Sequence, residues 1–306
     1  MSPAEMAPRP FSPGPDPRRM RATCLVCASP TLHAHGPAPL SLRRCGACGL
    51  VFVDPIPTPA EIAAREDAAF HGGVADHTGE MFEAYYRNYP DDPVVRGFRE
   101  VVRRLKEITG DGTLVDVGIG TGLLLHLGAE AGFRVLGCEI SPDSARRATE
   151  EFGVEVAVGD FLDTDLPADV AAITMGDVLE HTHDPRRFLE RAFAALRPGG
   201  VLYVAVPNHR STTFLAADLL SRVPALAGLG SRVYVPNHYW YFSPANLGQL
   251  LEQTGFRVEL TRQEAPYLGR YAFSPPVRLG LTALNALGRV TNLQARAEAY
   301  ARKPLR

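Results

Sequence analysis

The strongest constraint on the fold is an alternation, from residue 113 onward, of short apolar runs with segments of helical period. Segments that fit helices of about 10 to 14 residues separate these runs, which is the pattern of βαβ units and a parallel sheet. The C-terminal part departs from this alternation, with predicted helices at 243–254 and 276–290. The sequence therefore predicts an α/β domain. Its predicted strands are 113–117, 134–138, 155–158, 170–175, 201–206, 256–261 and 295–302.

The turn after the first predicted strand carries the glycine-rich sequence LVDVGIGTG at 114–122. Glycines let the backbone turn tightly and approach a ligand, at the sheet edge where open α/β folds bind ligands. The glycines do not have the dinucleotide spacing Gly-x-Gly-x-x-Gly, because residue 123 is leucine, and the Walker sequence is absent. Asp116 would also repel a phosphate at this turn. A ligand with a neutral or cationic centre fits better.

This turn resembles motif I of the class I S-adenosylmethionine-dependent methyltransferases, and the resemblance continues in order along the chain. Glu139 ends the second predicted strand, where the family places an acid on the ribose hydroxyls. Gly159-Asp160-Phe161 follows the third strand, where the family's acid and the next amide read adenine. The loop 175–181 and the turn Leu196-Arg197-Pro198-Gly199-Gly200 also match. A Rossmann-like domain that binds another nucleotide is the alternative.

The resemblance implies a Rossmann-like, seven-stranded, mostly parallel sheet with helices on both faces. It also implies S-adenosylmethionine as cofactor. The expected cofactor-binding residues are Asp116, Gly118, Gly120, Gly122, Glu139, Ile140, Asp160, Phe161 and Asp177.

Four cysteines near the N-terminus have the spacing C-x₂-C-x₁₇-C-x₂-C, which is typical of structural zinc sites. Cys24, Cys27, Cys45 and Cys48 are therefore predicted to hold one Zn²⁺ in a small zinc ribbon. A closed site of four thiolates would support folding and not catalysis. The alternative is two redox or disulfide pairs, whereas Cys138 is expected in the core.

The loop after the fourth strand, DVLEHTHD at 177–184, is the predicted catalytic segment. His181 is the first candidate for a general base because histidine titrates near neutral pH, and Glu180 could orient it. A purely structural role for His181 stays open. His238, which precedes four consecutive aromatic residues, is the second candidate, and the alternative for that segment is packing beneath a helix capped by Ser243.

The predicted organisation has four parts. Residues 1–20 are rich in proline and expected to be disordered, 21–59 form the zinc ribbon, and 60–109 form a helical linker or cap. Residues 110–306 form the methyltransferase domain. Two lid insertions are expected within this domain. The first lies near 209–236 and has apolar residues at helical spacing over 211–227. The second lies near 270–293 and could instead pair with a second subunit to form a homodimer.

Hydropathy and net charge limit the expected location of the protein and the class of its substrate. No apolar run reaches about 18 residues, so no transmembrane helix is expected, and residues 1–21 do not read as a signal peptide, which favours a cytoplasmic location. The net charge of −2 argues against binding nucleic acid through bulk charge.

The predicted function is methyl transfer to a small molecule, on oxygen or else on carbon or nitrogen. A zinc ribbon ahead of such a domain resembles bacterial proteins of sugar, polysaccharide and natural-product biosynthesis. One alternative is an RNA methyltransferase that grips its substrate with ribbon arginines. Another is a module that binds the cofactor without transfer.

Overall fold

The computed structural model describes residues 21–36, 41–62, 64–65, 93–223, 225–231, 233–266, 268 and 273–305. The predicted disordered tail at 1–20 and most of the predicted helical linker, at 66–92, lie outside the described residues. The end of that linker is helix α3 (Pro93–Thr109). Its apolar stripe faces the core, with Val95, Val101, Val102 and Leu105 buried. Val95 lies seven residues before Val102, so it shares the same stripe.

Seven strands form the central sheet, in the order β10-β11-β8-β7-β4-β5-β6. Strands β4 to β8 pair in parallel, whereas β10 and β11 are antiparallel at one edge. The predicted seven-stranded, mostly parallel sheet is confirmed. The strands are β4 (Thr113–Val117), β5 (Arg134–Glu139), β6 (Val156–Val158), β7 (Val170–Gly176), β8 (Leu196–Pro207), β10 (Arg257–Glu264) and β11 (Arg296–Arg302).

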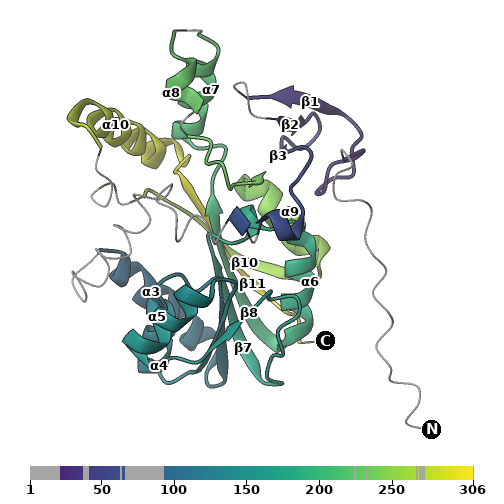
Figure 1. The fold of residues 1–306 in the computed structure, drawn as a ribbon, viewed down its shortest axis with the longest axis vertical. Coiled ribbons are helices and arrows are strands. Elements are labelled where there is room, and N and C mark those ends of the chain that lie inside the picture. Colours follow the sequence, from purple (N-terminus) through teal and green to yellow (C-terminus); the bar gives the residue numbers. More distant parts are fainter. Residues whose placement is uncertain are drawn as a thin grey trace.

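Helices cover both faces of this sheet (Figure 1). Because successive side chains of a strand point to opposite faces, Leu114 packs with residues of α3 and α4. Its neighbour Val115 belongs to the second core, with residues of α6 and α9. The two cores hold the layers together. The further helices of these layers are α4 (Leu123–Glu130), α5 (Pro142–Phe152), α6 (Pro185–Ala195) and α9 (Pro244–Gln253).

Capping contacts fix the starts of two helices, the second of them at the cap that the sequence offered. Asp184 is the N-cap of α6, accepts a hydrogen bond from the Arg186 N–H at 3.1 Å, and is followed by proline. Ser243 is the N-cap of α9 and forms a capping box with Asn246. Such caps satisfy the first free N–H groups of a helix and fix where it begins.

Several boundaries differ from the prediction by one to three residues, and two segments differ more. β8 begins at Leu196 rather than at 201, because the preceding turn is already extended and Leu196 pairs with Val170. The prediction of one helix over 211–227 is wrong, since the structure has α7 (Thr212–Ser221) and a separate α8 (Ala227–Ser231). The sequence has proline at 224, which cannot donate the hydrogen bond that a continuous helix needs.

The N-terminal segment forms a second, antiparallel sheet in the order β1-β2-β3-β9. Its last strand, β9 (Trp240–Tyr241), comes from the α/β domain and pairs with β3. The rings of Phe52 and Trp240 stack there, with centroids 5.6 Å apart. The ribbon therefore shares both backbone and aromatic packing with the larger domain. Its own strands are β1 (Leu32–His35), β2 (Leu42–Cys45) and β3 (Val51–Val53).

Candidate active site

A cavity of about 1090 Å³ lies at the carboxyl ends of the parallel strands. Small-molecule sites typically occupy about 300–1000 Å³, so this one has room for a nucleoside and a second molecule. Among the predicted cofactor-binding and catalytic residues, only Gly122 does not line it. Those that do are Asp116, Gly118, Gly120, Glu139, Ile140, Asp160, Phe161, Asp177, Glu180, His181 and His238.

The glycine-rich turn is shaped by positive φ angles. Gly118 has φ 67°, and a Cβ there would lie 2.8 Å from the Val178 side chain across the loop. Gly122 has φ 78° and begins α4, where a Cβ would lie 2.6 Å from Ala148 on α5. Both contacts are too close for a side chain. Gly122 is thus required for the packing of two helices behind the turn, and it lies outside the cavity wall.

Two buried acids stand side by side at the ends of β4 and β5. The Thr174 hydroxyl donates to Asp116 at 2.5 Å, and the Ser141 N–H donates to Glu139 at 2.9 Å. Burial raises the pKa of Asp116 to about 7, against the opposing effect of the Thr174 hydrogen bond. A cation in the cavity would favour the ionised form of both acids.

The next strand ends supply one more acid and an apolar side chain. Asp160 accepts a hydrogen bond from the Leu162 N–H at 2.9 Å, which fixes its carboxylate in the turn after β6. Ile140 is 40% exposed on the cavity wall. Phe161 also lines the cavity, but its ring is buried beside Phe188, with centroids 5.7 Å apart. Acidic and apolar surfaces therefore adjoin at this end of the cavity.

The loop after β7 is held by an ion pair that the sequence did not reveal. Asp177 has φ 55°, and its carboxylate accepts a hydrogen bond from the Arg296 guanidinium of β11. Arg296 also lies 3.7 Å from Glu298, which accepts a hydrogen bond from the Tyr203 hydroxyl at 2.9 Å. Arg296 thus reduces the negative charge that Asp177 presents to the cavity. Only the pairing of β11 with β8 places it there.

The three predicted catalytic side chains come together. Glu180 and His181, in the 3₁₀ helix η2 (Leu179–His181), and His238 offer ligand atoms within 4.8 Å of one another. The two imidazole rings meet edge to face, with centroids 4.7 Å apart. The Tyr239 N–H donates to the Glu180 carbonyl at 2.7 Å, which joins the two segments.

The charges in this cluster are set by burial. The Glu180 side chain is fully buried, and neither carboxylate oxygen has a hydrogen-bond partner among the described residues. Burial raises the pKa of Glu180 to about 8, although the nearby His181 acts in the opposite direction. Burial also lowers the pKa of His238 well below its usual 6.5. His238 and the Glu180 carboxyl are therefore largely uncharged at neutral pH, and Glu180 favours a positive charge on His181 only when it is ionised.

The rest of this loop is anchored from outside the cavity. The Trp240 indole N–H donates to the Thr182 carbonyl at 2.8 Å. The His183 Nδ1 lies 2.8 Å from the Pro57 carbonyl oxygen, in the segment that follows the ribbon. His183 accordingly ties the loop to the N-terminal segment, and both His181 and His183 line the cavity.

The two predicted lid insertions differ in their relation to the cavity. Phe214, Val233 and Val235 of the first insertion line it. No described residue of 273–293 lines it, and α10 (Pro275–Thr291) packs instead on α7. The Thr212 hydroxyl donates there to the Leu284 carbonyl at 2.8 Å. Of the two insertions, the first alone lines the cavity as far as the described residues extend.

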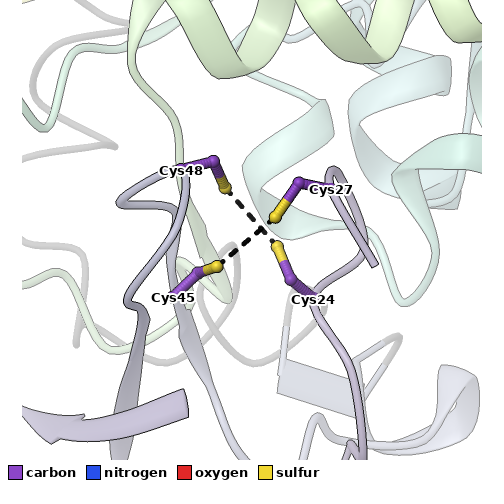
Figure 2. A group of neighbouring side chains, drawn as sticks. All are labelled: Cys24, Cys27, Cys45 and Cys48. Carbon is purple, nitrogen blue, oxygen red and sulfur yellow. Dashed lines mark hydrogen bonds between the residues drawn. The ribbon is translucent and has the colours of Figure 1, made fainter. Parts of the chain in front are cut away.

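The four N-terminal cysteines converge on one point (Figure 2). The sulfur atoms of Cys24 and Cys48 are 3.6 Å apart, and those of Cys27 and Cys45 are 3.5 Å apart. All are free thiols, so the alternative of disulfide pairs does not describe this structure. A tetrahedral Zn²⁺ with Zn–S bonds of about 2.3 Å holds its sulfurs about 3.8 Å apart. The donor set and its spacing therefore fit zinc.

Side chains of α6 and α9 donate hydrogen bonds to backbone carbonyls of the two C-x₂-C turns, the cysteine knuckles. Gln253 donates to Val26 at 2.7 Å, Arg186 to Leu25 at 2.9 Å, and Asn246 to Cys48 at 3.0 Å. A contact of this kind requires the knuckles to keep one conformation. The ribbon is thus docked on the same helices that pack against the central sheet.

The fold and the cavity define an enzyme of the Rossmann-like methyltransferase class. Residues 85–261 match the family described as "Methyltransferase domain". The match spans more than half of the chain, and the protein belongs to this family of S-adenosylmethionine-dependent methyltransferases. Within the part of the chain that the structure describes, no helix has the length and hydropathy to cross a membrane.

Individual relatives agree with this assignment. The chain is 33% identical over 223 residues to a ubiquinone biosynthesis O-methyltransferase from Methylobacterium sp. (strain 4-46), covering 66% of this chain and 85% of that protein. It is 30% identical over 155 residues to a protein of the same name from Xylella fastidiosa (strain 9a5c), covering 48% of this chain and 61% of that protein.

A solved structure shares the fold. Phosphoethanolamine N-methyltransferase 2 of Haemonchus contortus, in complex with S-adenosyl-L-methionine, aligns with a TM-score of 0.53 at 17% identity. The alignment covers 78% of this chain and 59% of that chain. This likeness concerns the fold alone.

Proposed function

We propose that this enzyme transfers the methyl group to a hydroxyl oxygen of a small molecule in a secondary-metabolite or sugar pathway. The observation that carries the proposal is the buried Glu180 carboxyl beside His181 on the cavity wall. A neutral hydroxyl is a weak nucleophile, and a base that accepts its proton speeds its attack. The relatives named O-methyltransferases support an oxygen acceptor.

The acids at the strand ends are the residues that would hold the cofactor. S-adenosylmethionine, when bound, supplies a methyl group activated by a positively charged sulfur. Asp116 and Glu139 each have one carboxylate oxygen fixed by a hydrogen bond from the protein, so they meet the ligand in a set orientation. Asp160 completes the acidic side of the cavity. This charge suits a cationic ligand and disfavours a phosphate.

His181 is the proposed proton acceptor. It gains positive charge when it takes the proton of the acceptor hydroxyl, and the adjacent Glu180 in its ionised form would stabilise that charge. His238 lies against the His181 ring but is the weaker base, because burial lowers its pKa. Its contact instead limits the orientations open to His181.

The test compares binding with turnover. The His181→Asn variant should retain its affinity for S-adenosylhomocysteine in calorimetry and lose about 10²- to 10⁴-fold in methyl transfer to a hydroxylated acceptor found by screening. His126→Asn is the matched control, since that ring stacks on Phe152 outside the cavity. Full turnover by His181→Asn would contradict the proposed base. No binding of S-adenosylhomocysteine by the wild type would contradict the cofactor site.

We assign the zinc ribbon a structural role, because its knuckle carbonyls are engaged by α6 and α9. Cys45→Ser should lose one zinc per chain, measured by elemental analysis, and lower the melting temperature of the whole protein. An RNA substrate is the competing assignment for the ribbon. RNA binding in gel shifts that weakens as salt rises would support that competitor and count against a small-molecule acceptor.

A further inference from the structure

A second group of metal-ligand side chains lies apart from the cysteines and outside the cavity wall. His35 ends β1, His209 follows β8, and Asp218 is on α7. Each offers one ligand atom, and these atoms lie within 4.8 Å of one another. Tyr234, which follows α8, is buried beside them. Four separate chain segments therefore converge on one point.

The contacts within this group are close and polar. The His35 Nε2 lies 3.7 Å from an Asp218 carboxylate oxygen and 3.3 Å from the Tyr234 hydroxyl. The same hydroxyl lies 3.4 Å from the His209 Nε2 and donates to Asp218. A tetrahedral zinc ion with bonds of about 2.0–2.1 Å holds its ligand atoms about 3.3 Å apart. The separation of 3.7 Å between His35 and Asp218 is close to that value, and the three ligand atoms all lie within 4.8 Å of one another.

We propose that His35, His209 and Asp218 bind a second zinc ion. Two imidazoles and one carboxylate form a donor set that suits zinc among the divalent metals. The Tyr234 hydroxyl is placed to be the fourth ligand or to hydrogen-bond the carboxylate.

Burial of the donor groups also suits a metal site. His209 is buried, and the His35 side chain is only 14% exposed. The carboxylate of Asp218 supplies the negative charge that a buried dication requires.

The position of the site indicates what the ion would do. It joins β1 of the ribbon to α7, the first helix of the insertion that covers the cavity. Phe214 of the same helix lines the cavity, while none of the three ligands does. The ion would thus hold the insertion in place against the ribbon. This role does not depend on the acceptor or on His181.

Metal stoichiometry tests the proposal on the full-length protein. Purified in the presence of Zn²⁺ and dialysed, the wild type should contain two zinc ions per chain by elemental analysis. His209→Gln and Cys45→Ser should each contain one. His33→Gln is the matched control, because His33 is an exposed histidine of the same strand and should leave both ions. A single zinc in the wild type, with the four thiols intact, would overturn the proposal.

Cobalt substitution keeps the test decisive if a variant does not fold. Co²⁺ bound to thiolates gives intense sulfur-to-metal charge-transfer bands, whereas Co²⁺ bound by nitrogen and oxygen gives only weaker visible bands. The wild type should titrate with both signatures, two Co²⁺ per chain in all. Saturation at one Co²⁺ with the thiolate signature alone would show that the group is only a hydrogen-bonded network around Tyr234.

Discussion

The buried Glu180 carboxyl predicts an unusual pH dependence of stability in the ligand-free enzyme. Its pKa is about 8 in the folded protein, against a reference value of 4.5. Between these pH values unfolding releases a proton, so the free energy of unfolding falls as pH rises, by about 1.4 kcal/mol per pH unit. Below about pH 4.5 Glu180 is protonated in both the folded and the unfolded protein, and above about pH 8 it is ionised in both. The effect is therefore confined to the pH range between these two values. Summed over this range, the loss is about 3 to 5 kcal/mol.

Glu180→Gln should remove this loss, because the amide does not titrate. Urea unfolding of both proteins at about pH 5 and about pH 8.5 measures the free energies. Between the two pH values, the free energy of unfolding of the wild type should fall by about 3 to 5 kcal/mol more than that of the variant. Glu190→Gln is the control, since this glutamate is exposed on α6 and should track the wild type. Parallel pH profiles of Glu180→Gln and wild type would refute the argument from burial.

Two further predictions concern the cofactor end of the cavity. Glu139→Gln should weaken binding of S-adenosylhomocysteine about 10- to 100-fold in calorimetry, because a hydrogen bond to a charged group contributes about 1.5–3 kcal/mol; unchanged affinity would contradict its proposed role. Gly122→Ala should destabilise the protein by about 2 to 4 kcal/mol in urea, since the new methyl group meets Ala148 at 2.6 Å in addition to the strain at φ 78°. Gly153→Ala, at φ 66° with open space around it, should show only the strain, about 1 kcal/mol. Equal losses would contradict the steric argument.

The features that the sequence predicted well depend on the spacing of residues that lie close together in the chain. A cysteine pair separated by two residues, or an acid at the end of an apolar run, occupies nearly the same place in any chain that forms those elements. Asp116, Glu139 and Asp160 therefore lie on one cavity as expected. The sequence indicated His181 and His238 only as two separate candidates. It did not predict their contact, because that depends on how the loop after β7 is anchored.

The features that the sequence did not reveal depend on pairing between distant segments. Arg296 reaches Asp177 because β11 pairs antiparallel with β8, and no local pattern specifies that register. The position of Gly122 behind the turn follows from the packing of α4 against α5. Likewise, nothing near residue 240 indicates that Trp240 forms the edge strand of the ribbon sheet.

That edge strand has a consequence for how the chain acquires its structure. A nascent ribbon lacks its fourth strand until residues 240–241 emerge from the ribosome, because Val51 pairs with Tyr241 and Phe52 with Trp240. Until then the free side of β3 exposes backbone groups that another chain could pair with. Early metal capture by the thiols would keep the half-built sheet folded during synthesis, and a fragment cut before position 240 should aggregate.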